Sequence, residues 1–511
     1  MSRVEETVKN SIVSLIIQAV TVVLSFVTRT VLIKAMGEQY LGINGLFGNI
    51  LNMLSLAELG VGTTIMYFMY KPMVDHDEQK ISILMSVYAR VYNTIGVVIM
   101  LVGLIISPFL GVFMKEVPDI PHLTLIFILY VMNMSASYLF SYKGSIINVA
   151  QKNYIVNTIR FLFTVVQTIV QLLVLSLTRN YILYYSCAIV FSVLANFAVA
   201  TKANQMFPYL KKPVKGRLEL SERKQIVKDI SAMFSHNIGS FVVYSTDNLI
   251  IAKIIGIIEV GLYSNYTMIL TAVSTFLNLL FDSLTASIGN LMHSESKEKS
   301  YDIFRNIFFA TCWLVGFCAV CLFVLYNPFI TLWIGEKYTF RGYVVFFIVL
   351  NFYLGLIRRP VNAFKHTVGL FWNDRYKPLF EAGVNLVTSL ILVKFFGICG
   401  VFMGTTISTI TVCVWLEPYI LYKNFYKKNV WEYFSLLFRY MAVPVVSIII
   451  IQGISMLFHE ITIESFLVQM FLCVSVPNLL FWIIFRKTTE MKYMEEIFEC
   501  ILSRIRRKNI A

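Results

Sequence analysis

Ionisable side chains within long apolar segments are the residues of this sequence that could do chemistry. In a membrane-spanning helix such a group costs about 2.5–3.5 kcal/mol on insertion scales, so it needs a charged partner or a water-filled cavity. The candidates are Arg29, Glu58, Arg90, Asp247, Asp282 and Glu381. Groups of this kind typically contact a substrate, carry a proton or hold a gate. We take the first five as candidate substrate-binding or gating residues.

Two pairs of these charges are predicted to interact. Arg29 lies in the first apolar segment and Asp247 in the seventh. An internal repeat, described below, would bring these segments together, and an Arg29–Asp247 ion pair there could close an outer gate. Arg29 could instead extend its guanidinium to the membrane surface beside Lys34. Glu58 could pair with Arg90 on the third helix, carry a proton or bind a cation.

The composition indicates an integral membrane protein. Of the 511 residues, 58% are hydrophobic and 14% are charged, and the mean hydropathy is +0.72. A soluble domain carries about 25% charged residues. Because the start of the chain lacks the features of a removable signal peptide, the first apolar stretch is expected to remain as a helix. The net charge of +14 lies mainly in short loops and the tail. Membrane orientation explains that distribution, so no nucleic-acid partner is expected.

Apolar runs of about 20 residues predict about fourteen membrane-spanning helices in an all-α protein. They lie near 10–33, 41–67, 85–113, 122–142, 155–178, 182–202, 230–252, 262–290, 303–327, 342–358, 379–396, 400–422, 437–458 and 464–485. Placing both termini in the cytoplasm puts most Lys and Arg residues on that side. The tail beyond 485 has apolar residues at helical spacing and ends in a basic cluster. It is predicted to be an amphipathic helix, lying on the inner leaflet or docked on the protein.

An internal repeat indicates two similar halves. The pattern K-x-x-G-x-x-x-x-G occupies residues 34–42 and returns at 253–261, 219 residues later (253 − 34). About six predicted spans separate the copies, so both face the same side, as in two parallel lobes related by a pseudo-twofold axis. Two unrelated glycine-rich turns would also give this pattern. The predicted organisation is an N-terminal six-helix lobe (1–205), a basic cytoplasmic linker (206–229), a C-terminal six-helix lobe (230–425), two extra transmembrane helices (426–485) and a basic amphipathic tail (486–511).

The sequence gives no support for enzyme chemistry. It has neither a GxxxxGK[ST] phosphate loop nor an HExxH zinc motif. Its predicted outer loops are too short to carry an active site. Cys318-x-x-Cys321 lies on an apolar segment without further ligands, so we interpret it as two packing residues. We therefore expect no enzyme activity, no metal site and no cofactor.

Four stretches, in order along the chain, resemble one family of transporters. They are LGINGLFGNILNMLSLAELGVGTTI (41–65), NVAQKNYIVN (148–157), STDNLIIAKIIG followed by VGLYSNY (245–266) and GLFWNDRYKPLFEAGVNLVTSLILVKFFGICGVFMGTTIST (369–409). With about fourteen helices, the whole chain is similar to the Wzx-type oligosaccharide flippases of the polysaccharide transporter family. That family belongs to the multidrug/oligosaccharidyl-lipid/polysaccharide exporter superfamily.

The resemblance implies that the protein moves a polyprenyl-diphosphate-linked oligosaccharide from the inner to the outer leaflet of the bacterial cytoplasmic membrane. The two lobes would work by alternating access, for cell-surface polysaccharide synthesis. Implied partners are this substrate, membrane lipid, and glycosyltransferases or a polymerase of the same pathway. Arg29, Arg90 and Arg160 are cations of the type that binds a diphosphate. Since the embedded carboxylates are equally numerous, the cavity is expected to be less basic than a purely cationic one.

Two other functions stay open. A multidrug and toxin exporter would remove cationic drugs by sodium or proton antiport, and the embedded carboxylates would suit cations. The two helices beyond residue 437 argue against it, since that group usually has twelve. A membrane scaffold would use the basic linker and tail to recruit glycosyltransferases, with transport secondary.

Overall fold

The computed structural model describes residues 3–508 except 59, 214–215, 295, 371 and 458–459. It describes only the backbone for residues 3–9, 11–12, 57, 232, 235–245, 282–287, 289–294, 497, 500–502 and 504–508. Every regular element in the described chain is a helix, as predicted. A helix pairs its backbone N–H and C=O groups internally, which hydrocarbon surroundings require. The chain forms two compact units, unit 1 (residues 1–264) and unit 2 (residues 265–511), which are described separately.

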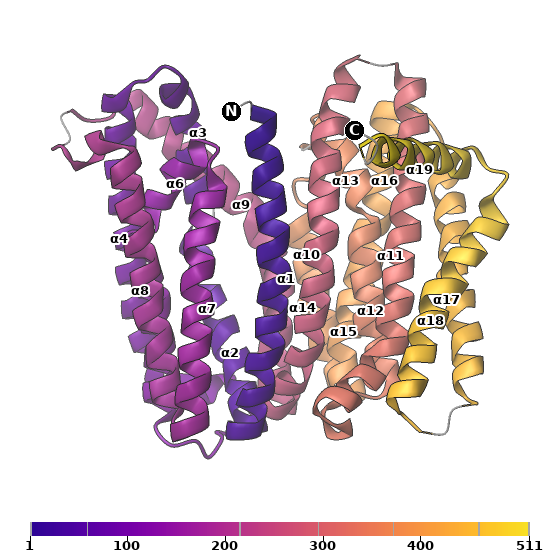
Figure 1. Cartoon of the computed structure of the whole chain (residues 1–511), viewed down its shortest axis with the longest axis horizontal. Helices are drawn as coiled ribbons and strands as arrows, with labels where there is room; N and C mark the ends of the chain where they lie inside the picture. The colour runs from indigo at the N-terminus through magenta and orange to yellow at the C-terminus, as the bar shows by residue number, and fades with distance from the viewer. Residues whose placement is uncertain are drawn as a thin grey trace. The chain divides into compact units, whose positions relative to one another are not determined.

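Unit 1 consists of α1 to α9 and the first turns of α10 (Figure 1). The bounds are α1 Arg3–Met36, α2 Glu38–Leu54, α3 Val61–Val74, α4 Glu78–Ile106, α5 Leu123–Tyr138, α6 Tyr142–Val149, α7 Asn153–Thr178, α8 Tyr181–Met206, α9 Leu220–Ile250 and α10 Ile257–Ser294. Three 3₁₀ segments follow α2, α4 and α8, and a π-helical segment follows α9: η1 Ser55–Glu58, η2 Ser107–Phe113, η3 Pro208–Lys211 and η4 Ile251–Ile255.

Two predicted spans of unit 1 are interrupted. The span predicted at 41–67 is divided into α2 and α3, with η1 and Gly60 between them. The span predicted at 122–142 bends by 41° where α5 passes into α6. At these breaks the backbone leaves the helical hydrogen-bond pattern, which membrane proteins tolerate where the chain is buried in protein or lines a cavity. Both breaks border the site described below.

The two copies of the glycine repeat pack against each other within unit 1. A side chain at Gly42 would place its Cβ 2.1 Å from the carbonyl oxygen of Ile257. A side chain at Gly261 would place its Cβ 3.0 Å from the backbone nitrogen of Gly42. The glycines therefore let α2 and α10 approach at backbone contact. A pseudo-twofold axis between the copies would produce such a contact, and the predicted lobe boundaries stay a prediction.

Unit 2 contains the rest of α10 and the helices that follow it. Their bounds are α11 Lys297–Ile334, α12 Gly342–Ile357, α13 Arg359–Thr367, α14 Lys377–Phe396, α15 Ile398–Ser408, α16 Trp415–Leu421, α17 Trp431–Ser455, α18 Ile463–Phe485 and α19 Thr489–Lys508. Short 3₁₀ and π-helical segments connect several of them: η5 Glu336–Tyr338, η6 Trp372–Asp374, η7 Thr409–Val414 and η8 Tyr422–Tyr426.

Helix α11 is the centre of unit 2, and the last two spans, α17 and α18, pack directly against it. Pro444 of α17 lies against Gly316, where a Cβ would be 2.7 Å from the proline ring. On α18, Asn478 accepts a 2.7 Å hydrogen bond from the indole of Trp313. The tail helix α19 runs crosswise to α17 and α18 (Figure 1) and begins with an ion pair of 2.5 Å between Glu490 and Arg305 of α11. Its start is thus docked on the protein, and its contact with a membrane surface stays a prediction.

The helices identify a multi-pass membrane protein. Among the described residues, ten helices are long and apolar enough to cross a membrane, or eleven if the bent α5–α6 pair is one span. Each of the predicted spans overlaps a helix or a pair of helices. The total of fourteen crossings stays a prediction, partly because interrupted spans such as α2–α3 are too short on either side of the break.

Candidate functional site

A polar cavity of about 830 Å³ lies inside unit 1. It is lined by η1 and by side chains of α3 to α8, so both interrupted spans contribute to its wall. Cavities of roughly 300–1,000 Å³ are the usual size of sites that enclose a small molecule or part of a larger one. We refer to it as the unit 1 cavity.

Amides and hydroxyls dominate the wall of the unit 1 cavity. The side-chain amides are Asn133, Asn148, Asn153, Asn157, Gln167 and Asn196, and the aliphatic hydroxyls are Ser55, Thr63, Ser137, Ser141, Ser145, Thr164 and Ser192. Amides and hydroxyls can both donate and accept hydrogen bonds. The buried Oδ1 atoms of Asn133 and Asn148 have no hydrogen-bond partner among the described residues. The wall therefore has unused capacity to bind a polar molecule.

Glu58 supplies the carboxylate of the unit 1 cavity. It accepts a 2.5 Å hydrogen bond from the hydroxyl of Tyr92 and a 2.7 Å hydrogen bond from that of Tyr138. Tyr88 donates to the Tyr92 hydroxyl (3.3 Å), and Ser145 donates to the Tyr88 hydroxyl (3.2 Å). This chain of hydroxyls links α4, α5 and α6 to the break in the second span. Glu58 is thus held in place by neutral donors.

Two glycines make room for this arrangement. Gly60 has a φ of +86°, and a Cβ there would lie 2.5 Å from the Cβ of Met233 on α9. Both the left-handed backbone and the close contact require glycine. A Cβ at Gly62 would lie 2.9 Å from the hydroxyls of Tyr88 and Tyr92. Gly60 therefore permits the left-handed turn after Glu58, and Gly62 leaves room for the hydroxyls of Tyr88 and Tyr92.

Arg160 of α7 supplies the cation of the unit 1 cavity. Its guanidinium lies opposite Gly144, 3.9 Å from where a Cβ of that residue would be. Among the described residues, no carboxylate forms an ion pair with Arg160, and its side chain is exposed. Apart from the tyrosines, Glu58 and Arg160 are the ionisable residues in the described wall. The cavity therefore offers one cation and one carboxylate among many neutral polar groups.

The structure places the sequence-predicted residues in different surroundings. Arg29 donates a 2.8 Å hydrogen bond to the hydroxyl of Ser264 and lies near three buried tyrosines, so an ion pair with Asp247 stays a prediction. Asp247 is half-buried on α9 and interacts electrostatically with Tyr263. Arg90 is exposed on α4, and no ion pair joins it to Glu58 among the described side chains. Asp282 lies on α10, and its side chain is outside the described residues.

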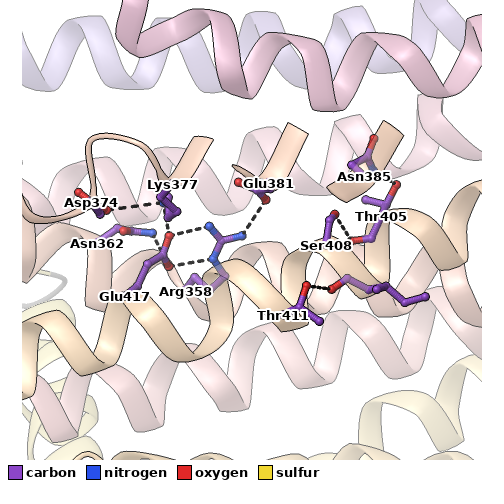
Figure 2. A network of polar contacts seen from close by, with 11 residues as sticks. Arg358, Asn362, Asp374, Lys377, Glu381, Asn385, Thr405, Ser408, Thr411 and Glu417 are labelled. Atoms are coloured by element: carbon purple, nitrogen blue, oxygen red, sulfur yellow. Dashed lines mark hydrogen bonds and ion pairs between the residues drawn. The ribbon is translucent and has the colours of Figure 1, made fainter. Parts of the chain in front are cut away.

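Unit 2 has a second polar region, an ion-pair network among α12 to α16 (Figure 2). Arg358 makes two hydrogen bonds to the fully buried carboxylate of Glu417, of 2.8 and 2.6 Å. Lys377 also contacts Glu417, and Asn362 donates to it at 3.1 Å. Glu381 lies 3.8 Å from Arg358. One carboxylate is thus surrounded by two cations and an amide.

The same network fixes the segment that leads into α14. Asp374 forms an ion pair with Lys365, whose side chain is 1% exposed, and lies 3.8 Å from Lys377. We use "unit 2 network" for the three cations Arg358, Lys365 and Lys377 and the three anions Asp374, Glu381 and Glu417. Each member has an oppositely charged neighbour within 4.0 Å. Buried ion pairs with such short contacts hold the helices together, and removing one partner lowers the free energy of unfolding strongly.

Sequence reasoning identified Glu381 but missed Arg358 and Glu417. Arg358 lies at the end of a predicted span, where a charge is unremarkable. Glu417 is 59 residues further along the chain. A usable signal was the four-residue spacing of Lys377, Glu381 and Asn385, which places three polar side chains on one face of α14 (Figure 2). A polar face on an apolar helix predicts polar partners inside the protein.

Comparison with known proteins shows the fold. No protein-family model matches this sequence, and no curated protein matches it significantly. The inward closed conformation of the lipid II flippase MurJ matches with a TM-score of 0.66 and 14% identity, over 93% of this chain and 98% of that chain.

Two MATE transporters have a similar fold. An inward-facing multidrug resistance MATE family transporter of the MOP superfamily matches with a TM-score of 0.60 and 14% identity, over 80% of this chain and 98% of that one. A mutant of the Vibrio cholerae MATE transporter VcmN matches with a TM-score of 0.53 and 13% identity, over 81% and 95%. The chain therefore has the fold found in transporters of the MOP superfamily.

Proposed function

We propose that this protein is a flippase that moves a polyprenyl-diphosphate-linked oligosaccharide from the inner to the outer leaflet of the bacterial cytoplasmic membrane. The observation that carries the proposal is the wall of the unit 1 cavity, with its six amides, its many hydroxyls and two buried asparagine oxygens that have no partner among the described residues. Taking an amide or a hydroxyl out of water without a new hydrogen bond costs roughly 2–7 kcal/mol. A glycan has many hydroxyls, so it can cross the membrane only along a surface that replaces its water.

The charges of the unit 1 cavity fit the same cargo. Arg160 has no carboxylate partner among the described residues, so its guanidinium can bind an anionic oxygen of a diphosphate or of an acidic sugar. Glu58 can accept hydrogen bonds from sugar hydroxyls beside those it already receives. The prenyl chain would stay in the surrounding lipid, because burying it in a polar cavity would gain nothing.

The comparisons favour a flippase by the extent of the match. The MurJ structure covers 93% of this chain, whereas the two MATE structures cover 80% and 81%. The two helices predicted beyond the second six-helix lobe, α17 and α18, pack against α11 as part of unit 2. A chain that needs these helices resembles a fourteen-helix flippase more than a twelve-helix exporter. Both termini would be cytoplasmic, as the distribution of Lys and Arg predicts.

The experiment measures the lipid-linked substrate in cells that lack the gene. We expect polyprenyl-diphosphate-linked oligosaccharide to accumulate on the inner leaflet, and the intact gene to relieve the accumulation. Arg160→Ala should fail to relieve it, since the variant removes the cation of the cavity. Arg179→Ala is the matched control, because Arg179 is exposed at the other end of the same helix. Absence of accumulation in the deleted cells would contradict the proposal.

A multidrug exporter is the second candidate, favoured by the MATE structures and by the carboxylate of Glu58 in the cavity. It predicts that deleted cells become sensitive to cationic drugs and that Glu58→Gln reproduces this sensitivity. A scaffold for glycosyltransferases predicts instead that Arg160→Ala leaves polysaccharide synthesis intact as long as the partners are still recruited. Measuring lipid accumulation, drug sensitivity and partner recruitment on the same strains separates the three.

A further inference from the structure

A stacked arginine lies on the surface of unit 2, in the segment between α13 and α14. The guanidinium carbon of Arg375 is 4.0 Å from the ring centroid of Trp372 and 4.6 Å from that of Tyr376. One guanidinium nitrogen also donates a 2.9 Å hydrogen bond to the carbonyl oxygen of Trp372. Both rings are exposed, Trp372 by 73% and Tyr376 by 57%. The aromatic rings hold the guanidinium in one orientation.

Arg375 differs from its charged neighbours because it has no anionic partner in the part of the chain that the structure describes. Asp374, the adjacent carboxylate, is engaged by Lys365 and Lys377, and no ion pair to Arg375 is found among the described residues. Stacking uses the faces of the guanidinium and leaves most of the N–H groups along its edge free. Such an edge matches two oxygens of a phosphate in a bidentate contact.

The base of this segment is rigid. Asp374 is tied to the almost fully buried Lys365, and Lys377 is tied to the buried Glu417. The unit 2 network therefore anchors the residues on both sides of Arg375. A fixed support keeps the guanidinium ready to bind, so little conformational entropy is lost when a ligand arrives.

The position of the segment indicates where its ligand comes from. One candidate membrane span, Gly342–Thr367, ends before it, and the next, Trp372–Phe396, begins within it. Arg375 thus lies at a membrane–water boundary, where aromatic side chains and phosphate groups of lipids are found. Leu379 and Phe380, in the first turn of α14, are more than half exposed and can contact an apolar chain.

We propose that Trp372, Arg375 and Tyr376 form a binding site for a lipid-borne phosphate. The guanidinium edge binds the phosphate oxygens, and the apolar side chains at the start of α14 contact the attached hydrocarbon. The ligand is either an anionic phospholipid or a polyprenyl diphosphate, which share this chemistry. As a phospholipid site it is independent of the proposed flippase function, and as a polyprenyl diphosphate site it rests on that function, because it would bind the lipid carrier of the proposed cargo.

The test uses the purified full-length protein and counts bound lipid by native mass spectrometry. The probes are phosphatidylglycerol, undecaprenyl diphosphate, phosphatidylcholine and inorganic phosphate. Arg375→Ala should weaken binding of one of the first two about tenfold, which is the effect of losing a charge-assisted contact. Arg375→Lys should weaken it less, because it keeps the charge and loses the stacked, bidentate edge. Arg359→Ala is the matched control, since Arg359 is an exposed arginine at the start of α13 and takes no part in the stack of Arg375 with Trp372 and Tyr376.

The outcomes decide the proposal and name the lipid. Weaker binding of phosphatidylglycerol in Arg375→Ala assigns the site to bulk phospholipid, and weaker binding of undecaprenyl diphosphate alone assigns it to a prenyl lipid. Equal binding in Arg375→Ala and Arg359→Ala would overturn the site, as would binding of inorganic phosphate that matches binding of the lipids. Thermal unfolding of each variant is measured in parallel, so that a loss of folding is not taken for a loss of binding.

Discussion

The unit 1 cavity and the unit 2 network both place polar groups among apolar helices, yet they treat those groups differently. In the network, all six charges have opposite neighbours within 4.0 Å, and Glu417 accepts hydrogen bonds from three residues. In the cavity, Arg160 has no carboxylate partner and two asparagine oxygens have no donor among the described residues.

This difference separates a structural region from a binding region. Polar groups that satisfy one another lower the energy of one arrangement of the helices, and they have nothing left to offer a ligand. Buried polar groups without partners lower the stability of the empty protein. A ligand that supplies the missing hydrogen bonds removes this loss, so its binding is favoured. Unit 2 thus contains a structural support, and unit 1 contains a wall with polar groups available to a ligand.

The largest effect is expected in the unit 2 network. Glu417→Gln leaves Arg358 and Lys377 without their shared anion, so the free energy of unfolding should fall by about 3–5 kcal/mol. Denaturant unfolding of the protein in detergent measures it. Glu381→Gln is the control, because Glu381 has a single ion pair of 3.8 Å and should cost far less. Similar stability of Glu417→Gln and the unchanged protein would mean that the network is not structural.

A smaller loss is expected at the break in the second span. Gly60→Ala forces a left-handed backbone on alanine and pushes its Cβ against Met233. The two effects should together lower the free energy of unfolding by about 2–4 kcal/mol. Gly48→Ala is the control, since nothing lies within 4 Å of the Cβ that alanine would add there. If both variants are equally stable, the break at Glu58 does not depend on glycine.

Next in size is the hydrogen bond that positions Glu58. Tyr138→Phe removes one of its two phenolic donors and should lower the free energy of unfolding by about 1.5 kcal/mol. Tyr142→Phe is the control on the next helix, because the Tyr142 hydroxyl forms no hydrogen bond with the described residues. A double-mutant cycle that combines Tyr138→Phe with Glu58→Gln checks that the loss of stability comes from the contact between the two side chains. If the losses of the two single variants add up in the double variant, the contact does not stabilise the protein.

The smallest expected effect has the opposite sign. Asn148→Leu replaces a side chain whose buried oxygen has no donor among the described residues by an apolar one of similar size. The protein should become more stable by about 1 kcal/mol, while lipid-linked oligosaccharide should accumulate in cells that carry the variant. The same unfolding and accumulation assays apply. A loss of stability would show that Asn148 is satisfied within the protein and belongs with the structural group.

The helices could be predicted from the sequence, and their contacts could not. Long apolar runs must form helices in lipid, so the spans followed from composition alone. The sequence predicts that Glu58 is an embedded charge, and Arg90 is a suitable partner by its charge. The structure instead satisfies Glu58 from Tyr92, two positions further along α4 and about 200° around the helix. Hydrogen bonds from neutral phenols leave no charge pattern in a sequence.

The unit 2 network was hidden for a related reason. Arg358 and Glu417 are far apart in the chain, and the packing of α13 against α16 brings them together. The cavity was likewise beyond prediction, since its amides and hydroxyls are scattered over six helices and η1. Most of these side chains are of common types, and they form a polar wall only because the fold directs them into one cavity.

The charge balance of the unit 2 network has a consequence for energy coupling. Its three cations and three anions sum to zero, so a membrane potential does no net work on the network when it moves as a body. A single elementary charge, by comparison, gains or loses about 2.3 kcal/mol for each 100 mV it crosses. Any voltage dependence of the proposed transport cycle therefore has to arise outside this network, from other embedded charges such as Arg29, Glu58 and Arg160 or from the charge of the proposed cargo.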